Sequence, residues 1–336
     1  MAAKDDVLGF HAQWYDPRPQ LVKDFVLKYY PLTHEADMTD VKSHRLFLKR
    51  SKLPSTIKAG DFIVGGKVII YGRELSLVEY ADPATRNRLA TSSNTGGLLL
   101  DPSTTSKWGD IIAAAEQSGC RITECRTVAF AGRAADVAAQ ELGTSPDAFM
   151  TGAGVSMLVA FRGAGVASLA AGSGIYPLSG DSNLFQLAAE NGSTATFDSC
   201  TCCVLKPHAV KAGNVGTILA TIQAQGYDVS AMQSFSLSRA SAREFLEVYK
   251  GVVADYGTVV DEFAAGSVIA MELRAEDAVT QFRKTAGPWD VETAKELFPN
   301  TIRAQFGVDN VRNAVHCTDL EGDGKTECEY FFDLLQ

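Results

Sequence analysis

The chain has 336 residues, of which 46% are hydrophobic and 21% are charged, which is enough for two or three globular domains. No run approaches eighteen uninterrupted apolar residues and the first six residues are polar. We therefore expect a cytoplasmic protein with neither a membrane association nor a secretory leader. The net charge of −9 is unevenly spread: residues 1–90 carry 14 basic and 11 acidic side chains, residues 91–197 carry 5 and 9, and residues 198–336 carry 12 and 20. A basic segment on an acidic body favours an acidic partner surface, but no basic run with interleaved aromatic residues supports a nucleic-acid partner.

Short strands are predicted along residues 1–90. Apolar or alternating runs lie at residues 26–30, 45–48, 62–64, 68–71 and 75–80. The pairs Gly65-Gly66 and Gly72-Arg73 between them are typical of hairpin turns. About six strands at this spacing predict a small barrel or sandwich, closed by a short helix near residues 83–89.

The rest of the chain contains an internal repeat. Residues 99–102 parallel 204–207, residues 109–113 parallel 216–220, and residues 154–159 parallel 266–271. Each copy opens with a strand, an amphipathic helix and a second strand, at residues 121–129 in one copy and 228–237 in the other. This is the front half of a ferredoxin-like βαββαβ unit. The Gly/Ala/Ser-rich segment 164–199 between the copies is expected to form a short helix and loops.

The two copies differ in the residues that could carry chemistry. The first copy has Asp101 where the second has Lys206, and it contains no histidine, which excludes phosphohistidine chemistry there. In the second copy, His316 lies between Asn313 and a hydroxyl-acid pair, and such a lone imidazole is suited to accepting a phosphoryl group. Lys206 and Arg303 could hold the phosphates from which that group comes. The cysteines at 200, 202 and 203 are followed by no Cys/His pair at zinc spacing, so we expect buried reduced thiols and no metal site.

The block at residues 313–319 resembles the N-x-x-H-G-[ST]-D signature of the nucleoside diphosphate kinase family, and the resemblance extends over residues 198–336. It implies a ping-pong transfer of phosphate from a nucleoside triphosphate to a diphosphate, with Mg²⁺ accompanying the nucleotide. His316 matches the nucleophile, and Glu327, on a C-terminal helix expected at 325–335, matches the carboxylate that orients its ring. The family's phosphate and ribose contacts correspond to Lys206, Arg283, Arg303 and Asn313, with Tyr249 beside the histidine and Thr318 and Asp319 after it.

Several positions depart from the family pattern. The segment K-P-D-G becomes Lys206-Pro207-His208-Ala209, the glycine after the histidine becomes Cys317, and a phosphate-binding threonine becomes Trp289. The R-P-F-F segment, which supplies the base-stacking phenylalanine, becomes residues 250–253. Losing that stacking costs about 1–3 kcal/mol, so nucleotide affinity is expected to fall roughly ten- to hundred-fold.

Blocks at residues 10–16, 40–42, 47–50 and 68–73 resemble the DM-ten domain of ciliary proteins, a pleckstrin-homology-like (PH-like) fold. That resemblance implies a place on axonemal doublet microtubules. Lys49-Arg50 then either contacts the acidic surface of tubulin or forms an ordinary solvated hairpin.

Together these features predict an α+β protein of three domains. A PH-like β domain at 1–90 precedes a degenerate nucleoside diphosphate kinase-like domain at 91–197 and a nearly complete one at 198–336. This order resembles the DM-ten-containing nucleoside diphosphate kinase homologues of cilia and flagella. The resemblance implies a structural microtubule inner protein with tubulin and neighbouring axonemal proteins as partners.

Two alternatives remain at this point: an active nucleoside diphosphate kinase that uses phospho-His316, and a nucleotide sensor that binds without turnover. The two kinase-like copies are also expected to pack against each other as an internal pseudo-dimer.

Overall fold

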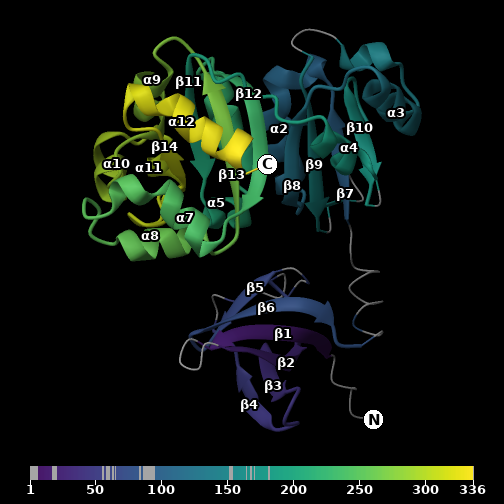
Figure 1. The fold of residues 1–336 in the computed structure, drawn as a ribbon, viewed down its shortest axis with the longest axis vertical. Helices are drawn as coiled ribbons and strands as arrows, with labels where there is room; N and C mark the ends of the chain where they lie inside the picture. Colours follow the sequence, from purple (N-terminus) through teal and green to yellow (C-terminus); the bar gives the residue numbers. More distant parts are fainter. Residues whose placement is uncertain are drawn as a thin grey trace. The chain divides into compact units, whose positions relative to one another are not determined.

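The computed structural model describes residues 7–16, 21–54, 57, 61–62, 64, 66–82, 85, 95–150, 154–163, 165–166, 169, 171–180 and 182–335. The chain divides into two compact units, Met1–Ser93 and Asn94–Gln336 (Figure 1). No helix among the described residues is long and apolar enough to cross a membrane.

The first unit contains an antiparallel sheet of six strands in the order β4-β3-β2-β1-β6-β5. The strands are β1 (Leu8–Asp16), β2 (Leu21–Tyr30), β3 (Glu35–Asp40), β4 (Leu46–Lys52), β5 (Lys67–Ile70) and β6 (Arg73–Tyr80). Its core is rich in aromatic residues, and the rings of Tyr29 and Phe62 stack with their centroids 3.9 Å apart. The predicted β-rich character is confirmed, but no pairing joins the edge strands β4 and β5 in the described part of the unit.

The predicted turn at Gly72 is confirmed, the strand predicted at 62–64 is wrong, and the helix predicted at 83–89 lies almost entirely outside the described residues. Tyr71 and Gly72 join β5 to β6 with φ angles of 48° and 76°, the positive values that a two-residue type I′ hairpin requires. The strand predicted at 62–64 is wrong at its described positions, because Phe62 lies outside any strand and places its ring in the core instead. The expected helix at 83–89 and Gly65 fall outside the described residues, apart from Thr85.

The second unit is built on one antiparallel sheet of eight strands, in the order β10-β7-β9-β8-β12-β13-β11-β14. The strands are β7 (Thr95–Leu100), β8 (Arg121–Val128), β9 (Ser156–Arg162), β10 (Ile175–Ser179), β11 (Cys200–Leu205), β12 (Asp228–Ser236), β13 (Ser267–Arg274) and β14 (Val315–Cys317). The helices are α2 (Trp108–Gln117), α3 (Arg133–Leu142), α4 (Leu184–Glu190), α5 (Pro207–Ala212), α6 (Val215–Ala224), α7 (Arg239–Phe245), α8 (Tyr256–Phe263), α9 (Ala278–Ala286), α10 (Val291–Leu297), α11 (Ile302–Phe306) and α12 (Gly324–Glu329).

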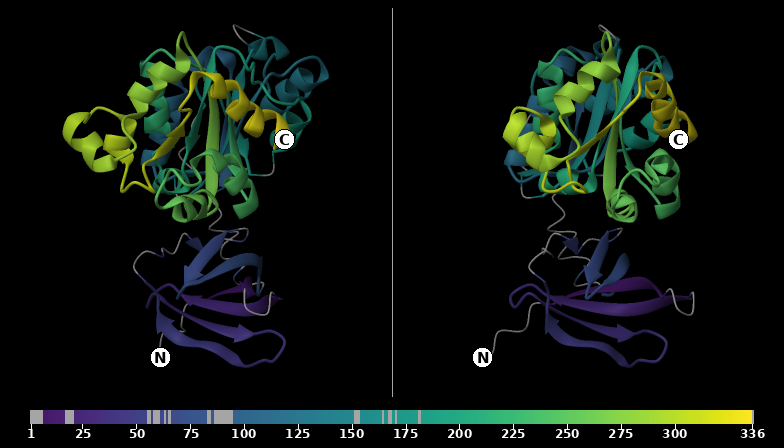
Figure 2. Two further views of the ribbon diagram at one scale, coloured as in Figure 1. Left: turned by 60° about the vertical axis from the view of Figure 1, so that its left-hand side comes forward. Right: turned by 90° about the vertical axis from the view of Figure 1, so that its left-hand side faces the viewer.

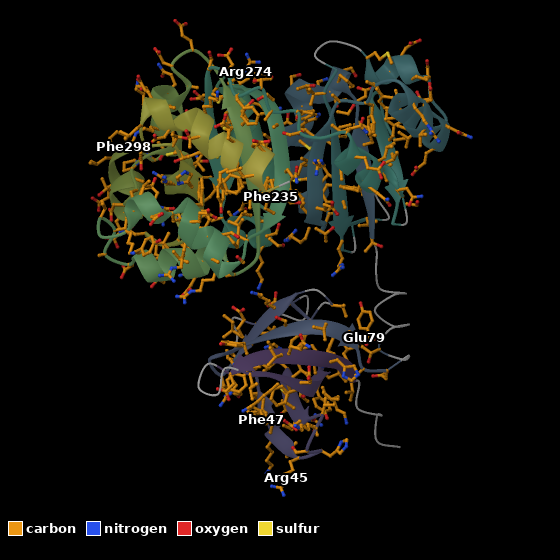
Figure 3. All side chains as sticks on the ribbon, in the orientation of Figure 1. Arg45, Phe47, Glu79, Phe235, Arg274 and Phe298 are labelled. Carbon is orange, nitrogen blue, oxygen red and sulfur yellow. The ribbon has the colours of Figure 1, made fainter. Side chains whose placement is uncertain are left out.

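Helices cover both faces of this sheet (Figure 2). In the second half of the unit, α5, α6, α9 and α11 pack on one face, while α7, α8 and α12 pack on the other. A π-helical turn, Tyr330–Leu334, continues α12. Phe235 of β12 lies beneath this C-terminal segment, 5.3 Å from the ring of Phe331 (Figure 3).

The two halves of the sheet have the same topology. Numbered within each half, β10-β7-β9-β8 and β14-β11-β13-β12 both follow the order 4-1-3-2, which is that of a ferredoxin-like unit. The segment 164–199 therefore contains more than the predicted short helix and loops, since it supplies the fourth strand, β10, in addition to α4. Strand β10 escaped the sequence pattern because it is short and carries Pro177, which is tolerated at the edge of a sheet.

The expected packing of the two halves against each other is confirmed. The hydroxyl of Thr127 on β8 accepts the Met232 amide of β12 at 3.0 Å. On the helical layer, a Cβ atom added to Gly109 would overlap the backbone of Ala220, and one added to Gly216 would overlap the backbone of Ala113. Because these residues are equivalent in the repeat, the contact is reciprocal, like that of a two-fold dimer.

Each half also caps the helix of the other. The Glu116 carboxylate of α2 accepts the amides of Val215 and Gly216 at the start of α6, at 3.3 and 2.8 Å. Gln223, the equivalent residue of α6, accepts the amide of Gly109 in α2 at 2.9 Å. The first amides of a helix have no partner within it, so these side chains satisfy donors that would otherwise be buried alone.

We expect Glu116→Ala to lower the free energy of unfolding by about 2 kcal/mol, because it leaves two buried amides unpaired. Glu116→Gln retains an acceptor and should lose less. Burial raises the pKa of Glu116 above its ordinary value, so the wild type loses stability as pH rises through that pKa, whereas the glutamine variant does not. Denaturant unfolding of the three proteins from acidic to neutral pH measures both effects, and equal stability of all three would contradict the capping.

Candidate functional site

His316 lies on the edge strand β14, opposite Val204 of β11. Its ring faces α7 and α12, and the Phe245 ring packs against it edge-on at 4.9 Å. The Nε2 atom is 2.8 Å from Oε2 of Glu327, and the Thr318 hydroxyl donates to the same carboxylate oxygen at 2.9 Å. The relay that the sequence predicted, a histidine oriented by Glu327, is therefore present in the geometry, and Nδ1 is the nitrogen left free to react.

Helix α12 brings Glu327 to this position. Its first residue, Gly324, lies so close to the carbonyl of Cys200 that an added Cβ would overlap it. Only a glycine therefore allows the helix to begin directly against β11. Thr318 accepts the Cys202 amide at 3.0 Å, which ties the end of β14 to the same strand.

Lys206 and Arg303, two of the predicted phosphate ligands, are buried under the indole of Trp289. The Lys206 ammonium lies 5.0 Å from the ring centroid and the Arg303 guanidinium 5.6 Å, which are cation–π distances. Their hydrogen bonds go to the backbone: Lys206 donates to the Val311 carbonyl at 2.8 Å, and Arg303 to the Gly287 carbonyl at 2.8 Å. Lys206 is 0% exposed and Arg303 5%, so neither cation is presented to solvent.

Asn313 is also enclosed. Its side chain is 0% exposed and donates from Nδ2 to the Trp289 carbonyl at 3.2 Å. Its Oδ1 is buried without a hydrogen-bond partner in the described structure. Trp289 thus contacts three of the predicted nucleotide ligands, through its ring and through its backbone.

Tyr249 and Arg283 meet at Asp319, on the more exposed side of the site. The Tyr249 hydroxyl donates to Asp319 at 2.6 Å, and Arg283 forms an ion pair with the same carboxylate. Burial, followed by the hydrogen bond to Asp319, raises the pKa of Tyr249. The rings of Tyr249 and Trp289 lie 5.9 Å apart, so the tyrosine packs beside the indole. Arg283 is paired with an acid here, whereas the sequence predicted a phosphate contact.

His208 contributes to the site in a way that the sequence did not predict. Its Nε2 accepts the Ala314 amide at 3.3 Å, so its ring proton is on Nδ1, which lies 2.8 Å from Glu262. Ala314 has a positive φ of 70°, and this bond supports the unusual backbone just before His316. The only sequence signal was the replacement of a D-G pair by His208-Ala209.

Lys206→Met is expected to change how stability depends on pH. Burial, with a smaller contribution from Arg303, lowers the pKa of Lys206 to about 7, compared with ~10.4 in an unfolded chain. Between these values the unfolded chain holds a proton that the folded protein has lost. The wild type should therefore gain about 1.4 kcal/mol per pH unit over the variant as pH rises from ~7 to ~9. Urea unfolding measures the difference, and a constant difference would show that folded Lys206 keeps its charge.

In the first copy, a tyrosine occupies the strand position that corresponds to that of His316 in the second copy. Leu99 of β7 corresponds to Val204 of β11, and its partner on β10 is Tyr176. The Tyr176 hydroxyl lies 3.4 Å from that of Thr144. Asp101, at the lysine position, accepts the amide of Ser103 at 2.9 Å as a helix cap. Nothing at this site can be phosphorylated on an imidazole, in agreement with the sequence.

The second half of the unit is thus a ferredoxin-like domain with a histidine on its edge strand and a glutamate that orients the ring. The family model described as nucleoside diphosphate kinase matches residues 199–336. The chain is 35% identical to nucleoside diphosphate kinase homolog 7 of Rattus norvegicus, over 97% of this chain and 93% of that protein. The homolog 7 of Mus musculus shows the same identity and coverage. A solved structure of the Aquifex aeolicus nucleoside diphosphate kinase is 33% identical, covers 41% of this chain and 96% of its own, and has a TM-score of 0.39. The chain therefore belongs to the nucleoside diphosphate kinase family.

Proposed function

We propose that this protein acts as a structural member of its family, in which the kinase-type folds mainly supply binding surface. The observation that carries the proposal is the position of Trp289 over Lys206 and Arg303. A triphosphate needs both cations to neutralise its charge, but here the indole occupies the space beside them and their donors bond to carbonyl groups. Burial also lowers the pKa of Lys206 to about 7, so part of its positive charge is missing at neutral pH.

The proposal extends to a place in the cell. We place the protein inside the doublet microtubules of cilia or flagella, bound to tubulin and to neighbouring axonemal proteins. The support is the resemblance of the N-terminal blocks to a PH-like DM-ten domain and the excess of basic residues in residues 1–90. In this scheme residues 1–90, 91–197 and 198–336 are three domains, and the predicted catalytic residues His316 and Glu327 belong to the third.

Two assays test the structural role. With labelled ATP and Mg²⁺, we expect acid-labile phosphate to form about a hundredfold more slowly than in a protein without the indole, since displacing the indole costs roughly 3 kcal/mol. The same protein should co-sediment with microtubules. Stoichiometric labelling that is lost in His316→Ala, discharged by GDP, and unaccompanied by microtubule binding would overturn the proposal.

The alternative, an active nucleoside diphosphate kinase with Mg²⁺-nucleotide as substrate, has one observation in its favour. The histidine relay of His316, Glu327 and Thr318 keeps hydrogen-bond distances of 2.8 and 2.9 Å. Packing alone can preserve this geometry without catalysis, because Glu327 and Thr318 also connect α12 to β11. The relay is thus compatible with a purely structural role.

A further inference from the structure

A cluster of thiols surrounds a buried carboxylate on the α12 side of the sheet. Cys200 and Cys202 project from one face of β11, Glu272 lies opposite Cys202 on β13, and Cys328 comes from α12. One ligand atom from each of Cys200, Glu272 and Cys328 lies within 4.8 Å of the other two. Zinc binds sulfur at about 2.3 Å and carboxylate oxygen at about 2.0 Å, so three atoms at this spacing can surround a single ion.

The carboxylate is held in place as a metal ligand would be. Oε1 of Glu272 accepts hydrogen bonds from the Thr196 amide at 2.7 Å and from the Ser230 hydroxyl at 2.6 Å. Within the described structure, Oε2 accepts the Phe197 amide at 2.9 Å and no second donor, which leaves a lone pair on that oxygen. Outer hydrogen bonds of this kind fix the orientation of metal-binding carboxylates.

Two of the thiols lie next to the carboxylate. The sulfur atoms of Cys200 and Cys328 and a carboxylate oxygen of Glu272 are within 4.8 Å of one another. A bound cation would favour the thiolate form of these cysteines and offset the negative charge of the carboxylate.

We propose that Cys200, Cys328 and Glu272 form a site for a thiophilic divalent cation, Zn²⁺. Binding replaces the two thiol protons, which are released to solvent, and forms two metal–sulfur bonds and one metal–oxygen bond. The ion would join β11, β13 and α12. Since α12 also carries Glu327, the site would stabilise the helix that orients His316. Cys200 is 8% exposed, so an ion can reach the cluster from solvent at this residue.

The test uses the purified full-length chain after treatment with a chelator, with Co²⁺ as a spectroscopic probe and Zn²⁺ as its competitor. One equivalent of Co²⁺ should produce a sulfur-to-metal charge-transfer band in the near ultraviolet, which Zn²⁺ abolishes. A hundredfold excess of Zn²⁺ over its Kd should raise the unfolding midpoint by about 5 °C.

Cys328→Ser and Cys200→Ser should each weaken binding at least tenfold and remove the thermal shift. Cys203→Ser is the matched control, because Cys203 is buried on the same strand but faces the opposite side of the sheet. It should bind like the wild type. The absence of a band in the wild type, or an equal loss in Cys203→Ser, would overturn the site.

Discussion

Trp289→Thr should raise the nucleotide-dependent phosphorylation of His316 by about two orders of magnitude. The indole makes cation–π contacts with Lys206 and Arg303, each worth about 0.5–2 kcal/mol, and a nucleotide must displace both before its phosphates can bind. Threonine removes the ring and supplies a hydroxyl donor beside the two cations. Because the relay to Glu327 is already formed, no further rearrangement of the nucleophile is needed. The measurement is the rate of acid-labile labelling from ATP at equal protein concentration.

Two variants control this experiment. Trp289→Phe keeps an aromatic ring over the cations and loses only the indole nitrogen, so it should remain as poorly labelled as the wild type. The double variant Trp289→Thr/His316→Ala should show no acid-labile phosphate at all. If Trp289→Thr is labelled no faster than Trp289→Phe, the ring is not what closes the site.

Gly216→Ala is expected to lower the free energy of unfolding by about 3 kcal/mol or more. The new methyl group would overlap the backbone nitrogen of Ala113 on α2, and a backbone atom cannot turn aside as a side chain can. The two helices would have to separate, and the carboxylate of Glu116 would lose its bonds to the start of α6. Gly109→Ala should have a similar effect, because its methyl group would overlap Ala220 in the reciprocal contact. Denaturant titration followed by far-ultraviolet circular dichroism measures the change.

Gly257→Ala is the matched control for this prediction. Gly257 also lies in a helix, α8, but an added methyl group there meets open space. Alanine favours the helix over glycine by about 1 kcal/mol, so this variant should be as stable as the wild type or slightly more stable. Equal losses in Gly216→Ala and Gly257→Ala would mean that the close approach of the two halves contributes nothing to stability.

Much of the second unit could be predicted from residue spacing. The matched runs at 99–102 and 204–207 placed β7 and β11 correctly, and the repeated glycine-containing helices placed α2 and α6. Strand β10 was missed because a short edge strand with a proline carries little alternation. In the first unit, β1 and β3 were not predicted as strands, although alternate residues of each, Leu8, Phe10 and Ala12 in β1 and Ala36 and Met38 in β3, lie in the core.

The contact between His316 and Glu327 was expected from the resemblance to the nucleoside diphosphate kinase family, and the residue spacing alone did not predict it. The internal repeat predicted two similar modules that pack against each other, and the structure adds that they share one sheet. The sequence could not show that Trp289 covers the two cations, that Arg283 pairs with Asp319, or that Cys328 meets Cys200. Local periodicity governs strands and helices, whereas the direction of a side chain in a loop depends on every element packed around it. Whether this kinase-type site is open or closed was therefore decided by tertiary packing alone.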